Sequence, residues 1–396
     1  MGAESSTSAK KPEIVSLTKE QVQRTTETLK KWAQGKDFLN KRQFEEIYAE
    51  LQPVTDLLFD VAEDGGRCPF SNILLMADGM LGDAASQAAT LLRLFGTIAK
   101  ALEHVVSMYA RRNGLSDNDS SALLEYFMHD APPEARFDRW LLGHSVAAQL
   151  VLHVFAPLIF EKGPPLHPST PCNSPLLSHS AVMVINMHLP SERRKEWTLL
   201  FSSAEHGSSF AQLSKRINEE GPCVVVVNST NGRVFGCFAS EGFLMGPNYH
   251  GNATSFLFEL KPQLRIYSAT GLSNDYAYLN VQQVSLPNGL GIGGHETVWP
   301  FFIDEDYGKG ISMANVSSFE KCHLAGCDQF EISSVEVWRV GEKPQIPIDE
   351  DVRRSEKSII DKVDPEAVAL LELTGHKMHS EAYRDPAPLL DEPFEI

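Results

Sequence analysis

Two serines and a histidine lie close together in one short stretch of the sequence. Ser202 and Ser203 are followed by His206, and Asp304 could orient the imidazole if the fold brought it near. These residue types suit a hydrolase-like enzyme with a serine nucleophile. Ser202 lacks, however, the G-x-S-x-G turn that exposes such a nucleophile. A serine ahead of a helix more often caps it, so we predict cap and turn roles here and keep the hydrolase as the alternative.

A second catalytic pairing would use two glutamates. Glu205 and Glu336 could act as general acid and general base. They lie far apart in the sequence, and no pattern places them within hydrogen-bond reach. We therefore predict that the chain has no catalytic residues and is not an enzyme.

The candidate metal motifs are incomplete. Residues 60–66 resemble the start of a calcium-binding loop, but its third position is Ala62 and its twelfth is Ser71, and neither side chain is a carboxylate. Cys322 and Cys327 form a close cysteine pair with no second cluster to complete a zinc site. We predict no metal and no cofactor, and six reduced thiols in a cytoplasmic protein.

The glycine-rich segment 287–294 matches a nucleotide-binding loop only superficially. A G-x-G-x-x-G loop must follow a strand and open a helix, whereas the residues from His295 onward predict another strand. We predict a tightly turned loop under close packing.

The charge balance limits the kinds of partner that the chain can bind. The 396 residues carry 52 acidic and 35 basic side chains, a formal net charge of -17. Nucleic acid is an unsuitable partner, because binding phosphates requires clustered Lys and Arg. An anionic membrane would also repel the chain, so a basic protein surface is the expected partner.

The first half predicts a helical domain over residues 17–160. Thr18 and Asn40 begin capping boxes, and a long helix is expected from about Ala84 to Tyr109, ended by Asn113 and Gly114. With the residues around Asp60, this half resembles degenerate EF-hands.

The stretch from Trp140 to Phe160 is apolar and long enough to span a bilayer. It contains His144, His153 and Pro157, so a buried helix is the better prediction. A proline-rich linker follows at residues 161–177.

The second half predicts antiparallel sheets. Residues 224–227 are β-branched and should form a strand buried on both faces, followed by a hairpin turn at Asn231 and Gly232. Gly236 in the returning strand indicates close approach by another backbone. Further strands are expected at 197–201, 255–260, 264–267, 277–281, 298–304 and 334–340.

Motifs in this half carry a resemblance to a known family. They are the Ser-Ser-x-x-His-Gly run within 199–210, the Val-Phe-Gly-x-Phe-Ala-Ser run at 234–240, the glycine segment and the Val-Glu-Val-Trp run at 335–338. Their unbroken order resembles the TLDc-domain family. The resemblance implies a TLDc domain over 178–341, an α+β fold in which a β-sandwich of two antiparallel sheets is flanked by helices.

The resemblance also implies a function. The family lacks an established reaction, and members are linked to oxidative-stress resistance and to the vacuolar proton pump, the V-ATPase. The helical half and the tail look most like the lysosomal class, which implies TOR signalling components as partners. We expect a non-enzymatic regulator, cytoplasmic and peripheral on the lysosomal membrane.

The two ends of the sequence carry separate predictions. Residues 1–16 read as a flexible start in which Gly2 and Ser6 fit the N-myristoylation pattern. Residues 342–396 form an acidic tail with a helix expected at about 364–384. Its apolar stripe, including Leu370 and Leu373, should dock on the protein itself or on a partner.

Rim loops of a sandwich are frequent interaction surfaces. The candidate partner-binding residues are therefore His206, Gly207, Gly289, Gly291, Gly293, Gly294, Leu370 and Leu373.

Overall fold

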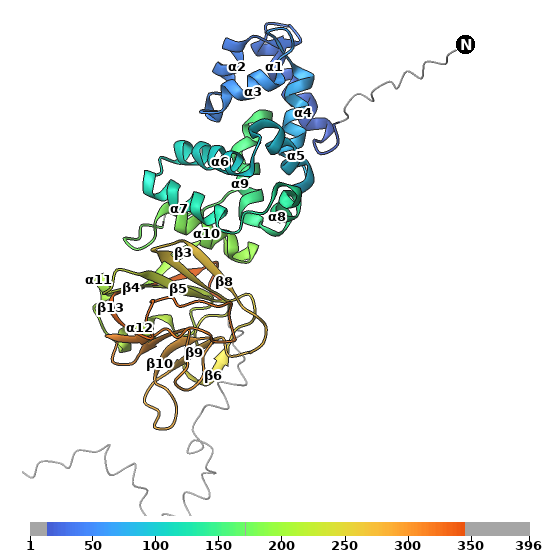
Figure 1. Ribbon diagram of the computed structural model, residues 1–396. Helices are drawn as coiled ribbons and strands as arrows, with labels where there is room; N and C mark the ends of the chain where they lie inside the picture. Colours follow the sequence, from blue (N-terminus) through green and yellow to red (C-terminus); the bar gives the residue numbers. More distant parts are fainter. Residues whose placement is uncertain (1–13, 171, 345–396) are drawn as a thin grey trace, which may run out of the picture. The chain divides into compact units, whose positions relative to one another are not determined.

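The computed structural model describes residues 14–170 and 172–344, and the described residues up to Lys343 belong to one compact unit (Figure 1). The helices of the first half are α1 (Lys19–Trp32), α2 (Lys41–Ile47), α3 (Thr55–Ala62), α4 (Phe70–Met80), α5 (Ala84–Phe95), α6 (Ile98–Asn113), α7 (Asp117–Met128), α8 (Phe137–Gly143) and α9 (Ser145–Phe155), with 3₁₀ turns at Ala49–Leu51, Glu134–Arg136 and Ala156–Ile159. The helical first half is confirmed.

Both predicted capping boxes are present. The side chains of Thr18 and Asn40 accept hydrogen bonds from the backbone N–H groups of Gln21 and Gln43, which satisfies donors that a helix start leaves free. The loops that follow α1 and α3 pair through two short antiparallel strands, β1 (Phe38–Leu39) and β2 (Cys68–Pro69).

The predicted start of the calcium-like loop was misplaced. Asp60 lies inside α3, and the turn that separates α3 from α4 begins at Glu63. The carboxylate of Glu63 accepts a hydrogen bond from the Gly66 N–H at 2.5 Å, so it closes the turn itself.

The single long helix expected from Ala84 to Tyr109 was wrong. Gly96 adopts φ = +79° and ends α5, and the Thr97 side chain then caps α6. A left-handed residue stops a helix because it turns the next N–H away from the helical ladder. The predicted stop at Gly114 is confirmed by its left-handed conformation.

The apolar stretch from Trp140 to Phe160 is also broken. His144 has φ = −102° and ψ = 76°, and it separates α8 from α9. Among the described residues no single helix is long and apolar enough to cross a bilayer. The helices within Glu134–Ile159 together have the length and composition of a membrane span, but they are bent by 93° at the break between them. Much of α9 is buried in the helical core, including Leu150 and Val154.

The described residues between 161 and 178 contain neither helix nor strand, although Leu166 and Leu177 are buried. Ser178 then caps α10 (His179–His188).

The remaining elements form a β-sandwich with small helices. They are α11 (Ser203–His206), α12 (Phe210–Ile217), a 3₁₀ turn at Ser191–Arg193, and the strands β3 (Trp197–Ser202), β4 (Cys223–Ser229), β5 (Val234–Ala239), β6 (Gly246–His250), β7 (Phe256–Lys261), β8 (Arg265–Ser268), β9 (Ala277–Asn280), β10 (Gly289–Ile292), β11 (Phe301–Asp304), β12 (Lys309–Ile311) and β13 (Gln329–Val340).

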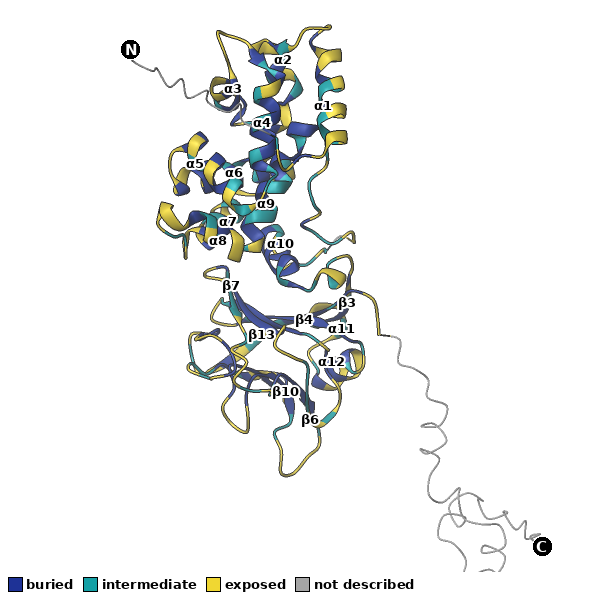
Figure 2. Ribbon diagram, turned by 90° about the vertical axis from the view of Figure 1, so that its right-hand side faces the viewer, coloured by how far each residue is buried: buried dark blue, intermediate teal, exposed yellow. Residues whose placement is uncertain are grey.

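Two antiparallel sheets share one long strand. The first has the order β3-β13-β4-β5-β7-β8 and the second β6-β9-β10-β11-β12-β13, because the start of β13 pairs with β12 and its end with β3. Apolar side chains from both sheets, such as Phe235, Leu290 and Val337, fill the space between them. Figure 2 shows the central strands as buried and many connecting loops as exposed.

The other face of the first sheet packs against α10. Val224, Val226 and Trp338 belong there to one apolar cluster with Val182 and Ile185, so β4 is buried on both faces, as predicted.

Glycines permit the closest approaches within the sandwich. A Cβ on Gly236 would lie 1.9 Å from the Val225 carbonyl oxygen, which confirms the predicted backbone contact. Cβ atoms on Gly291 and Gly294 would lie 2.7 and 2.5 Å from atoms of Trp299.

Candidate functional site

The serines and the histidine do not form a catalytic arrangement. The Nδ1 atom of His206 accepts a hydrogen bond from the backbone N–H of Ser202 at 3.0 Å, and the ring stacks on Phe201. Ser202 is buried, and the Ser203 hydroxyl accepts from the Val335 N–H at 3.1 Å. No hydrogen bond joins His206 to Asp304 within the described ranges. Ser202 precedes α11 without any side-chain cap hydrogen bond, so the predicted cap role was wrong, and the hydrogen bonds of Ser203 and His206 are with backbone groups.

Glu205 and Glu336 have different environments and do not form an acid–base pair. Glu336 is buried and accepts hydrogen bonds from the Ser174 hydroxyl and, at 3.0 Å, from the Trp338 indole N–H. Glu205 is exposed in α11. Glu336 therefore links the segment before α10 to β13 and satisfies a buried indole.

The glycine segment differs from its prediction as a rim loop. Gly289 and Gly291 lie in the buried strand β10, which pairs with both β9 and β11, and Gly293 and Gly294 are buried directly after it. The loop expectation was wrong, because packing against Trp299 and Phe302 selects glycine in a strand despite its low β propensity. These four glycines do not supply an exposed binding surface.

The other predicted partner-binding residues are placed differently. His206 is half-buried and Gly207 is exposed at φ = +80°. Leu370 and Leu373 lie outside the described residues, as does Gly2.

A cluster of histidines around Tyr109 escaped the sequence analysis. The Tyr109 hydroxyl lies 2.6 Å from His167 Nε2 and 3.1 Å from His179 Nε2. The two imidazole rings are 3.9 Å apart at their centroids. Burial lowers the pKa of His167 to about 3, helped by its neighbour His179 and by His153. Burial also lowers the pKa of His179, against an opposing effect of Asp119.

A second tyrosine and two further histidines repeat this arrangement between α7, α8 and α10. The Tyr126 hydroxyl lies 3.4 Å from His188 Nε2, and the Tyr126 ring contacts His144 edge-on. Burial lowers the pKa of His188 to about 4 and also lowers that of His144. The sequence feature that could have indicated these clusters is the concentration of histidines, since five of the 13 occur between residues 144 and 188.

A cavity of about 360 Å³ adjoins the first cluster. Its lining includes His167, His179, Cys172 and Asn173. Burial and the nearby Glu336 raise the pKa of the Cys172 thiol to about 12, so this thiol is a poor nucleophile at neutral pH. Throughout residues 14–170 and 172–344, no three His, Cys, Asp or Glu side chains are positioned to hold a metal ion.

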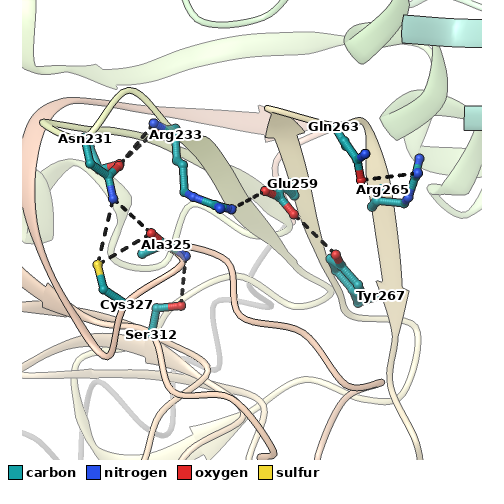
Figure 3. Close-up of polar contacts among 10 residues, drawn as sticks. Asn231, Arg233, Glu259, Gln263, Arg265, Tyr267, Ser312, Ala325 and Cys327 are labelled. Atoms are coloured by element: carbon teal, nitrogen blue, oxygen red, sulfur yellow. Dashed lines mark hydrogen bonds and ion pairs between the residues drawn. The ribbon is translucent and has the colours of Figure 1, made fainter. Parts of the chain in front are cut away.

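A polar network joins the β4–β5 turn to β7, β8 and the loop before β13 (Figure 3). Arg233 pairs with Glu259 at 2.7 Å, and the Tyr267 hydroxyl donates to the same carboxylate at 3.4 Å. Burial raises the pKa of Glu259 against the effect of Arg233. Asn231 reaches the Ala325 carbonyl at 3.0 Å, so the predicted hairpin turn is tied to the loop before β13. These contacts give the network a structural role.

A groove of about 500 Å³ lies along β11, β12 and β13. Asp304, Glu331 and the apolar side chains of Ile311 and Phe330 line it, with Lys309 as the one cation of this lining. Its mixture of carboxylates and apolar surface suits recognition of a protein segment, with only a few polar groups to fix orientation.

Comparison with known proteins assigns the sandwich to a family. The family model described as the TLDc domain matches residues 171–341. The matched range begins at the segment before α10 and ends directly after β13.

Relatives extend the similarity. The chain is 43% identical over 208 residues to MTOR-associated protein MEAK7 of Gallus gallus, covering 52% of this chain and 43% of that protein. It is 42% identical over 212 residues to MTOR-associated protein MEAK7 of Homo sapiens, covering 53% and 45%. It is also 28% identical over 167 residues to Oxidation resistance protein 1 of Xenopus tropicalis, covering 42% and 18%. The matched segment thus spans less than half the length of each of these relatives.

Proposed function

Since residues 171–341 form a TLDc domain, we propose that this chain is a non-enzymatic adaptor or regulator that acts in TOR signalling and in the response to oxidative stress. The supporting observation is the similarity to proteins named as MTOR-associated, together with the weaker similarity to a protein named for oxidation resistance. The Ser202–His206 contact supports the adaptor over the hydrolase. In a catalytic triad the Nδ1 atom of the histidine donates to a carboxylate that orients the ring, whereas Nδ1 of His206 accepts from the Ser202 backbone N–H.

The finer proposal is that the chain works at the cytoplasmic face of the lysosomal membrane and binds the V-ATPase. The net charge of -17 supports a basic protein surface as partner and opposes direct adsorption to anionic lipid. Acylation of Gly2 would add a reversible membrane contact, because one myristoyl chain binds a bilayer only marginally.

Affinity capture from lysosomal membranes tests this proposal. The intact chain should capture V-ATPase subunits and the TOR kinase, whereas Gly2→Ala should reduce recovery of the chain with membranes without abolishing capture from detergent extracts. Failure of the intact, folded chain to enrich either complex would reject the proposal.

A further inference from the structure

Three segments meet at one end of the second sheet. The β9–β10 connection, residues 281–288, leaves the sheet where Asn280 pairs with Gly289. Gly289 also pairs with Asp304, so the turn 305–308 lies at the same end. Met245 bridges to Leu279 and brings residues 244–245 there. We call residues 244–245, 281–288 and 304–308 the acidic–apolar rim.

The rim exposes several large apolar side chains. Val284 is fully exposed, Leu286 is 41% exposed and Met245 is 40% exposed. Isolated exposed apolar residues are common, but neighbouring ones at the end of a rigid sheet indicate an interaction surface.

Asn288 holds the exposed loop in place. Its Oδ1 accepts from the Gln283 N–H at 2.9 Å, and its Nδ2 donates to the Gln283 carbonyl at 3.0 Å and to Glu305 at 3.1 Å. These bonds close the loop on itself and fasten it to the neighbouring turn. Val284 and Leu286 are therefore presented by a preorganised segment, which reduces the entropy cost of binding.

The charged side chains of the rim are all acidic. Residues 266–308 contain no Lys or Arg. Of their five carboxylates, Asp304, Glu305 and Asp306 lie on the rim, whereas Asp275 precedes β9 and Glu296 follows β10 at the opposite end of the sheet. The groove beside the rim adds Glu331, with Lys309 as the cation of its lining.

We infer that the rim binds a basic amphipathic segment of a partner protein. The apolar side of that segment packs on Val284, Leu286 and Met245, while its Lys and Arg side chains pair with the carboxylates of the turn and the groove. An anionic membrane is the wrong occupant, because the same carboxylates repel it. The ring of the predicted partner residue His206 and that of Tyr307, in the turn of the rim, both contact the buried Phe201. This inference rests on the proposed adaptor function and names the surface and the partner's chemistry.

A matched set of full-length variants tests the surface. Val284→Ser with Leu286→Ser removes the apolar contact, and Asp306→Lys reverses one rim charge. Leu272→Ser is the control, because Leu272 is 77% exposed just before β9 and so lies at the opposite end of the same sheet. All four positions are exposed, so each variant should keep the wild-type melting temperature.

The first readout uses a defined probe, a synthetic amphipathic helix of Lys and Leu. The wild type and Leu272→Ser should bind it equally, the Ser–Ser variant at least about tenfold more weakly, and Asp306→Lys more weakly with a smaller response to salt. Equal binding by all chains, or equal wild-type binding of a Glu and Leu helix, would overturn the inference. So would rim-dependent binding of vesicles rich in phosphatidylserine.

The second readout is V-ATPase capture, which separates the inference from the proposed function. If the wild type and both rim variants capture the pump equally, the adaptor function stands and the rim is not its surface. If no chain captures the pump, the proposed function fails, and the peptide titration still decides the chemistry of the rim.

Discussion

Individual buried residues set the spacing and the polar pairing of the sandwich. Gly236 allows β5 to approach β4, and Glu336 accepts hydrogen bonds from the buried Trp338 indole N–H and the half-buried Ser174 hydroxyl. In the sequence, Gly236 indicates close approach by another backbone, whereas Glu336 could have been a general acid or base. Their contacts give each a structural explanation.

Replacing Gly236 with Ala should lower the free energy of unfolding by about 1–3 kcal/mol, because a Cβ there overlaps the Val225 carbonyl oxygen and the strands must move apart. Gly143→Ala is the control, since a Cβ at Gly143 meets no heavy atom within 4 Å. Denaturant unfolding of the two variants measures the difference, and equal stability would contradict the close-approach argument.

Replacing Glu336 with Leu should destabilise the protein by about 1–3 kcal/mol, because the buried Trp338 indole N–H loses its acceptor, whereas the Ser174 hydroxyl is only half-buried. Glu336→Gln should cost less, because the amide keeps an acceptor oxygen. The exposed Glu205→Leu provides the comparison and should remain near wild type. A larger loss at Glu205 than at Glu336 would show that the structural assignment is wrong.

At the level of elements, two tyrosine–histidine clusters join α6 and α7 to α10 and the segment before it. Tyr109 contacts His167 and His179, and Tyr126 contacts His188. The Ser180 hydroxyl donates to the Asp119 carbonyl at 2.9 Å in the same region. These contacts couple the helical half to the start of the TLDc domain through groups that titrate.

The stability of this junction should depend on pH. The folded pKa values of His167, about 3, and His188, about 4, lie below the ordinary value of 6.5, so the unfolded chain binds protons that the folded chain does not. Their stabilising contribution is complete above pH 6.5 and is lost as pH falls toward the folded values. For each imidazole that stays neutral in the folded chain, the free energy of unfolding should fall by at most about 2 kcal/mol between pH 6.5 and pH 5.

Denaturant unfolding at pH 7, 6 and 5 checks this expectation. His188→Asn should flatten the pH dependence even if it lowers stability throughout, because it removes one titrating group. A slope identical to that of the wild type would contradict the assignment.

Local signals in the sequence predicted much of the architecture, while contacts between distant residues escaped them. The helix starts at Thr18 and Asn40 could be predicted, because a capping box depends on a residue only three positions away in the sequence. The hairpin at Asn231 and Gly232 was equally local. The break at Gly96 was missed because apolar helix formers continue on both sides.

The glycine segment that forms β10 was predicted as a loop for a different reason. Its glycines carry no strand signal of their own, and the Trp299 ring that selects them becomes a neighbour only in the folded sheet. The histidine clusters escaped for a related reason, since Tyr109 and its partners lie 58 and 70 residues apart. Site residues set by such distant packing cannot be inferred from spacing along the chain.

At the scale of the whole molecule, the proposed function is binding by an acidic chain that contains a TLDc domain. The net charge of -17 and the cation-free stretch at residues 266–308 both favour a basic partner. Association with such a partner is strengthened at long range by charge and should therefore weaken as salt screens it.

The most direct measurement is the affinity of the intact chain for the purified V-ATPase at about 50 mM and about 200 mM salt. We expect binding at the lower salt concentration and a clear loss of affinity at the higher one. Absence of binding at both concentrations, with a chain that unfolds cooperatively and is therefore folded, would contradict the adaptor account.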